Sequence, residues 1–130
     1  MVPITPTMRL VIIESPYAGD IEANVAYARA CVRDALARGE APFASHLLYT
    51  QPGILRDEVP AEREQGIAAA LAWYRAADAA AVYTDRGISR GMKQGIATAT
   101  AAGRPVEYRS LGPSPASSAG QPVTPSPQTA

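Results

Sequence analysis

The chain has 130 residues, and its 12 acidic side chains balance its 12 basic side chains. This length allows one domain with a single core and excludes two. The even charge argues against broad, nonspecific nucleic-acid binding, which needs a basic surface, but it allows a local anion site. The residues are 47% hydrophobic but only 6% aromatic, so we expect a core of small aliphatic side chains. The single cysteine, Cys31, lies in no metal-binding motif, and we expect it to be buried on a helix.

The N-terminal segment and the hydropathy pattern favour a cytoplasmic protein. Residues 1–7 lack the basic segment and apolar run of a signal peptide. No apolar run approaches the roughly 20 residues that span a membrane. The sequence contains no Gly-Lys-Ser/Thr phosphate loop and no glycine-rich dinucleotide motif after its first predicted strand. We therefore expect no membrane association and no cofactor.

Residues 110–130 differ in composition from the rest of the chain. They contain no charged residue and are rich in proline, serine, threonine, glycine and alanine. Such a segment cannot bury enough apolar surface to offset its ordering entropy. The sequence therefore predicts one α/β domain over residues 1–109, folded from about residue 8, and a disordered tail over residues 110–130.

The first half of the domain predicts a strand, a helix and a second strand. Residues 8–13 form a short branched apolar run, which is typical of a strand buried on both faces. A helix is predicted over residues 21–38, with Asp20 as its N-cap and Gly39 at its end. A weaker strand follows at residues 42–46, and residues 50–59 form a loop. The expected buried face of the helix consists of Ile21, Val25, Ala28, Val32, Ala35 and Leu36.

The second half repeats this alternation. Pro60 begins a helix that Asp78 ends. Its buried face is predicted to be Ile67, Ala70, Leu71 and Tyr74. Strands are predicted at residues 79–84 and 106–109. The turn at residues 85–89 and a helix over residues 90–102 lie between them, and this helix directs Met92, Ile96 and Ala99 inward.

The alternation of strands and helices predicts a small three-layer α/β domain with a parallel, four-stranded sheet. Right-handed crossovers follow from strand twist. We expect the strand order 2-1-3-4, with the reversal of order between the first and third strands. Ligands of such sheets bind beyond the carboxyl ends of the strands at this reversal. The loops after the first and third strands are therefore predicted to form one ligand site.

The loop after the first strand offers several groups for a ligand. Ser15 carries a hydroxyl, Tyr17 carries a ring for stacking, and Gly19 permits close approach of the backbone. Pro16 and Asp20 complete the predicted ligand-binding set in this loop. An ordinary turn with an N-cap is the alternative interpretation.

The loop after the third strand predicts an anion or ribose site. Ser89 is expected to cap the following helix, whose N-terminal N–H groups bind phosphate or carboxylate. Arg90 adds a bidentate donor, and Gly91 lets a ligand sit close. A capped helix with a solvated arginine is the alternative. The remaining predicted ligand-binding residues are Gly87, Met92 and Ser45, and Ser45 precedes His46 at the expected end of the second strand.

Several segments together resemble the nucleoside 2-deoxyribosyltransferase-like superfamily, and most closely a small branch found in phage and bacterial genomes. They are residues 14–19 (ESPYAG), Asp78, residues 85–92 (DRGISRGM) and residues 103–106 (GRPV). The resemblance covers nearly all of residues 8–109. It implies a flavodoxin-like, Rossmann-like parallel sheet, cleavage or transfer of N-glycosidic bonds of nucleosides or nucleotides, and homo-oligomers. It also implies that Tyr17 matches a family tyrosine and Asp85 a family aspartate near the sugar.

The chain departs from this family on the helix over residues 90–102, which matches the helix that carries the family's nucleophilic glutamate. One alignment places Gly95 at that position and another places Lys93 there. Neither is a carboxylate, which covalent glycosyl transfer requires. Glu14, Asp20 or Asp85 is a candidate to stabilise charge during direct attack by water. His46, the only histidine, is a further catalytic candidate, with a structural hydrogen-bonding role as the alternative.

Three functions remain open at this stage. The favoured prediction is binding of a small nucleotide- or nucleoside-like molecule at the carboxyl ends of the strands, because the glutamate is missing. The first alternative is a hydrolase or transferase of N-glycosidic bonds that uses Glu14, Asp85 and His46. The second is a noncatalytic interaction protein that acts through its proline-rich tail. Trp73 and Tyr74 are predicted to be core or interface residues by helical periodicity, and a homodimer face is the second interpretation.

Overall fold

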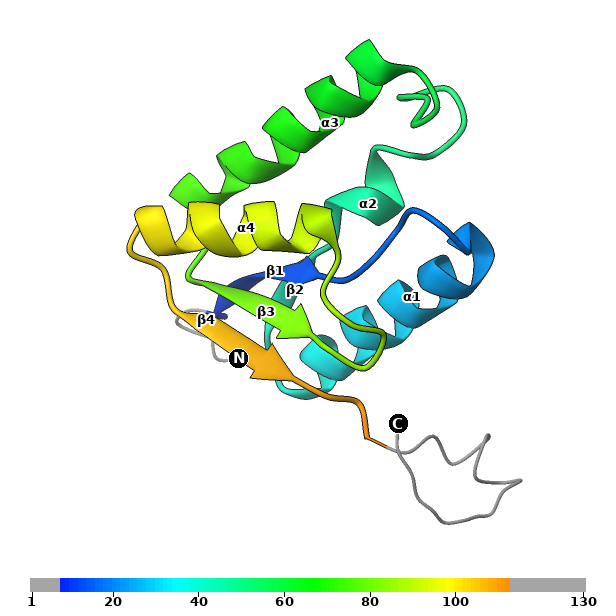
Figure 1. Ribbon diagram of the computed structural model, residues 1–130. Helices are drawn as coiled ribbons and strands as arrows, with labels where there is room; N and C mark the ends of the chain where they lie inside the picture. Colours follow the sequence, from blue (N-terminus) through cyan, green and yellow to red (C-terminus); the bar gives the residue numbers. More distant parts are fainter. Residues whose placement is uncertain (1–7, 113–130) are drawn as a thin grey trace, which may run out of the picture.

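The computed structural model describes residues 8–112 (Figure 1). Its four strands form one parallel sheet in the order β2-β1-β3-β4. The predicted fold class and strand order are therefore confirmed, and the reversal of order lies between β1 and β3. The strands are β1 (Leu10–Glu14), β2 (Ala41–Phe43), β3 (Ala79–Tyr83) and β4 (Val106–Arg109).

Helices cover both faces of the sheet (Figure 1). On one face, α1 (Ile21–Ala37) packs Cys31 and Ala35 against Val11 and Ile13 of β1. The other face is covered by α4 (Arg90–Ala101), α3 (Pro60–Ala72) and the 3-10 turn η1 (Trp73–Arg75). A short helix, α2 (Ser45–Leu48), follows β2. Burial raises the pKa of the Cys31 thiol to about 12, which fits the buried role expected from the sequence.

Local signals in the sequence explain where the helices begin. The Asp20 carboxylate accepts a hydrogen bond from the backbone N–H of Ala23 and so caps α1, which begins at Ile21. The Ser89 hydroxyl accepts from the N–H of Met92 at the start of α4. Pro60 is the first residue of α3, where its missing N–H costs nothing. These predicted helix starts are confirmed.

The prediction for the second strand is wrong in its extent. The second strand is shorter than expected, and His46 lies on α2 instead of at a strand end. The expected burial of Tyr74 is confirmed, since its side chain lies in the core, and only Trp73 of the candidate homodimer pair is exposed. Trp73 is 48% exposed and packs its ring against Phe43, with 4.9 Å between ring centroids.

The apolar faces of two helices are also placed differently from the prediction. On α1, Ile21 and Leu36 are exposed, whereas the polar residue Asn24 is buried. A helix of 17 residues on a short sheet buries only a narrow stripe, and both exposed residues lie at its ends. On α3, no residue is fully buried, and Ile67, Ala70 and Leu71 border a cavity.

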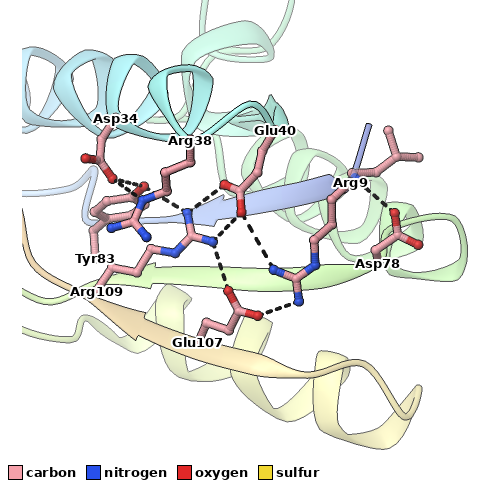
Figure 2. Close-up of polar contacts among 9 residues, drawn as sticks. Arg9, Asp34, Arg38, Glu40, Asp78, Tyr83, Glu107 and Arg109 are labelled. Carbon is pink, nitrogen blue, oxygen red and sulfur yellow. Dashed lines mark hydrogen bonds and ion pairs between the residues drawn. The ribbon is translucent and has the colours of Figure 1, made fainter. Parts of the chain in front are cut away.

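A cluster of charged side chains joins β4 to the opposite edge of the sheet (Figure 2). The guanidinium of Arg109 donates to both carboxylate oxygens of Glu40, at 2.8 and 2.7 Å, and to Glu107 at 2.9 Å. Arg9 donates to Glu107 on the other side. The side chain of Arg109 is only 5% exposed. Its charge is therefore balanced inside the protein and not by solvent.

The start of the predicted tail contacts the domain. The Ser110 hydroxyl and the Leu111 N–H both donate to Asp85, and Leu111 packs against the core under α1. The remainder of the expected disordered tail, residues 113–130, lies outside the described residues. No helix among residues 8–112 has the length and apolar character needed to cross a membrane.

Candidate functional site

A cavity of about 230 Å³ opens at the carboxyl ends of β1 and β2, beside the start of α4. Its wall includes Tyr17 from the first loop and Ser89 from the second. Pockets that bury a drug-sized ligand usually measure about 300–1,000 Å³. A molecule of nucleoside size would therefore be held with part of its surface exposed.

Most of the residues predicted for the site lie on this cavity. The predicted site residues that line the cavity are Glu14, Ser15, Tyr17, Ser45, His46, Ser89, Arg90, Gly91 and Met92. Asn24 on α1 links the two loops. Its side-chain amide donates to the carbonyls of Tyr17 and Ala18, and its oxygen accepts from Arg86. Sequence reasoning missed this link, although a polar residue on the buried face of a predicted helix could have indicated it.

Asp85 does not line the cavity. Its carboxylate accepts hydrogen bonds from the Tyr27 hydroxyl, the Ser110 hydroxyl and the Leu111 N–H. Burial alone would raise its pKa, but these donors hold the pKa below its usual value. Asp85 therefore fastens the segment after β4 to α1, and its carboxylate lies away from the cavity.

The other predicted residues outside the cavity form the turns that support it. Pro16 is buried, and Gly19 and Gly87 have φ angles of 98° and 85°. Residues that carry a side chain rarely adopt these backbone angles, so both glycines are needed for the course of the turns. They are not contact residues of the cavity.

Asp20 acts as the N-cap of α1 and does not line the cavity. We expect Asp20→Ala to lower the free energy of unfolding by about 1 kcal/mol, the usual cost of a lost N-cap. Chemical denaturation measures this change. Ligand affinity of the folded variant should equal that of the unmodified protein, and a large loss would return Asp20 to the binding set.

Glu14 brings a carboxyl group to the wall of the cavity. Its Oε2 accepts a hydrogen bond of 2.7 Å from the Tyr74 hydroxyl. Among residues 8–112 it forms no ion pair. Burial raises the pKa of Glu14 to about 7. The group therefore exchanges its proton near neutral pH, as acids and bases in active sites commonly do.

Ser15 and His46 form a polar pair on the same cavity. The Ser15 hydroxyl lies 2.7 Å from Nε2 of His46, and both side chains are mostly buried. Burial lowers the pKa of His46 to about 4, so the imidazole is neutral at pH 7. The pair offers a hydroxyl and an uncharged ring to a ligand and adds no positive charge.

The start of α4 supplies the positive side of the cavity. The backbone N–H groups of Arg90 and Gly91 belong to the first turn, which has no intrahelical acceptors for them. The Arg90 side chain is exposed and forms no ion pair within the described part of the chain. Together these groups can hold an anion such as a phosphate.

Sequence reasoning missed one wall of the cavity. Tyr49, Thr50, Leu55 and Asp57 from the segment after α2 line it, as do Ile67, Ala70 and Leu71 from α3. The apolar stripe of α3 was assigned to the core because periodicity cannot distinguish a covered face from a pocket wall. No group of three or more metal-binding side chains occurs among residues 8–112.

Comparison with known proteins identifies the family. A family model described as "Domain of unknown function (DUF7768)" matches residues 9–109. The chain belongs to this family. The DUF7768 match covers all four strands and every helix of the sheet's two faces. No curated protein matches the chain.

Two solved structures share the fold of this DUF7768 domain. One is a 2-deoxyribosyltransferase from Bacillus psychrosaccharolyticus, with a TM-score of 0.56 and 18% identity over 78% of this chain and 72% of that chain. The other is a 2-deoxyribosyltransferase from Leishmania mexicana, with a TM-score of 0.52 and 16% identity over 89% of this chain and 74% of that chain. The shared fold agrees with the resemblance found in the sequence. Placement in a phage and bacterial branch and homo-oligomer formation stay predictions.

Proposed function

We propose that the cavity at the carboxyl ends of β1 and β2 binds a nucleoside- or nucleotide-like molecule. The observation that carries this proposal is the convergence of Tyr17, the Ser15–His46 pair and the start of α4 on one cavity. An aromatic ring can stack on a base, and the neutral polar pair can bind ribose hydroxyls. The helix start and Arg90 can hold a phosphate. The solved neighbours, which act as deoxyribosyltransferases, are consistent with such a ligand.

The first test measures binding. A panel of nucleosides, nucleoside monophosphates and ADP-ribose is screened by thermal shift, and each ligand that raises the melting temperature is titrated by calorimetry. We expect at least one member of the panel to bind. Failure of every member to bind would contradict the proposed function.

Tyr17→Ala should weaken the best ligand about tenfold or more, because stacking of a base on an aromatic ring contributes about 1–3 kcal/mol. Calorimetric titration measures the change. Tyr108→Ala is the matched control, because Tyr108 is 59% exposed on β4 and lies outside the cavity. Equal affinities of the two variants would remove Tyr17 from the site.

Arg90→Gln should separate nucleotides from nucleosides. A lost charge-assisted hydrogen bond costs about 1.5–3 kcal/mol, so we expect roughly a tenfold loss or more for a nucleoside monophosphate. The affinity for the matching nucleoside should not change. Arg29→Gln, on the exposed surface of α1, is the control. Equal losses for both ligands would mean that Arg90 does not contact the phosphate.

Cleavage or transfer of an N-glycosidic bond is the second candidate function. The specific observation in its favour is the carboxyl group of Glu14 on the cavity wall, with a pKa of about 7. Glycosidic chemistry requires a carboxylate near the sugar. Incubation of each bound ligand followed by chromatography for released base tests this candidate.

A further inference from the structure

Glu14 and Gly95 share one volume in the folded protein. Gly95 is buried on α4. A Cβ atom built on it would lie 2.0 Å from Oε2 of Glu14, 2.3 Å from Cδ and 2.6 Å from Oε1. Real Cβ atoms essentially never approach another atom below 3.0 Å. The carboxyl group of Glu14 therefore occupies a place that exists only because residue 95 has no side chain.

The strand directs Glu14 to this place. Side chains of a strand alternate between the two faces of the sheet. Ile13 packs on the α1 face and Ile12 on the face covered by α4. Glu14 follows the alternation toward α4, at the point where β1 ends and the cavity begins. Its position is thus set by regular strand geometry.

A purely structural role explains this arrangement poorly. The Tyr74 hydroxyl donates to Oε2, and a glutamine at position 14 would accept the same hydrogen bond without carrying a charge. A buried carboxyl group without a cation reduces stability when it ionises. Gly95 adds a further cost, because glycine is unfavourable inside a helix. Two destabilising residues that fit each other at a cavity indicate a function.

We infer that Glu14 is the catalytic carboxylate of this cavity, supplied by β1 to the space above Gly95, and that it acts on the N-glycosidic bond of a nucleoside-like substrate. The inference rests on the proposed binding function. Tyr74 positions the group by holding Oε2, which leaves Oε1 for the substrate.

The reaction proposed is hydrolysis. The bond between the anomeric carbon and the base nitrogen breaks, and its electron pair stays with the nitrogen. The ionised Glu14 carboxylate stabilises the positive charge that develops on the sugar. The oxygen of a water molecule bonds to the anomeric carbon and releases one proton to solvent. The base nitrogen takes one proton from solvent, so the net reaction adds one water molecule across the bond.

The test compares binding with turnover in Glu14→Gln. Its affinity for the best ligand should stay within about threefold of the unmodified protein, because one oxygen and the shape are kept. Release of base should fall on the order of 1,000-fold, because the charge that stabilises the transition state is removed. Glu22→Gln, on the exposed first turn of α1, should leave both unchanged.

A carboxylate exchange adds a gain of function. Glu14→Ala should abolish base release. Glu14→Ala combined with Gly95→Glu should release base at least about tenfold faster than Glu14→Ala alone, since the new carboxyl group reaches the same space from α4. Full recovery is not expected, because a misplacement of 1 Å costs about 100-fold. Gly95→Ala should lower the melting temperature when Glu14 is present and not when residue 14 is alanine. This comparison of melting temperatures needs no ligand and also checks that the variants fold.

The outcomes separate the two proposals. If no ligand of the panel binds, the proposed function fails and the inference fails with it. If a ligand binds but the unmodified protein releases no base, or Glu14→Gln releases it at the normal rate, only the inference is overturned. The inference is also overturned if Gly95→Ala is equally harmful with and without the Glu14 side chain.

Discussion

Glu14→Gln is expected to raise the free energy of unfolding by about 3 kcal/mol at pH 8, while having little effect below pH 4.5. The cause is the ionisation of a mostly buried carboxyl group. Burial raises the pKa of Glu14 in the folded protein from 4.5 to about 7. Glutamine occupies nearly the same volume, can accept the hydrogen bond from Tyr74 and does not ionise.

The sign follows from comparing the folded and unfolded chains. The unfolded chain loses the Glu14 proton near pH 4.5, whereas the folded chain keeps it to about pH 7. The stability contributed by this group is thus fully present below pH 4.5 and is lost as the pH rises to about 7. The glutamine variant has no such loss, so its advantage should grow over this interval and then level off.

Urea denaturation at several pH values between 4.5 and 8 measures the effect. His46 also depends on pH, because burial lowers its pKa to about 4, but in the opposite direction. Its contribution is present above pH 6.5 and is lost as the pH falls toward 4. Since both proteins contain His46, its contribution cancels in their difference. A difference that is constant across the range would show that Glu14 is not buried as described.

The fold could be predicted because each of its signals is local. The branched run that became β1 and the alanine-rich run that became β3 are too apolar for an edge strand. Asp20, Pro60 and Ser89 mark the helix starts. Chain connectivity and the right-handed crossover then leave few strand orders. The short helix α2 was missed because four residues are too few to show a period.

The candidate site could be predicted only in outline. Its location follows from the reversal of strand order, which the elements alone determine. The roles of Asp85 and Glu14 depend on partners far away in the sequence. Ser110 and Leu111, after the last strand, draw Asp85 away from the cavity. The fit of Glu14 above Gly95 requires the distance between a strand and a helix, which no local pattern contains.

Arg109→Met is expected to lower the free energy of unfolding by about 3–5 kcal/mol, the usual cost of removing one partner of a buried ion pair. Arg109 provides both of the short hydrogen bonds to the Glu40 carboxylate, at 2.8 and 2.7 Å (Figure 2). Without it, the nearest cation to Glu40 is Arg9, at 3.6 Å. The side chain of Glu40 is only 10% exposed, so water cannot replace the lost partner.

Arg38→Met, beside this cluster, is the matched control (Figure 2). Arg38 also pairs with a carboxylate, Asp34, at 2.8 Å, but its side chain is 45% exposed. Exposed pairs contribute about 0–1 kcal/mol, so this variant should lose little stability. Denaturant titration of both variants at pH 7 measures the contrast. Losses of similar size would mean that burial does not determine the strength of the Arg109 pair.

The double variant Arg109→Met with Glu40→Leu separates two causes of the loss of stability. One is the lost attraction between Arg109 and Glu40, and the other is the cost of leaving the Glu40 carboxylate buried without a cation. If most of the loss in Arg109→Met comes from the unpaired Glu40 carboxylate, removing that carboxylate should restore most of the stability, because apolar replacements of buried ion pairs are often neutral or better. Glu107 would still be paired with Arg9. A double variant that is less stable than Arg109→Met would instead mean that the charges themselves hold β4 against the far edge of the sheet.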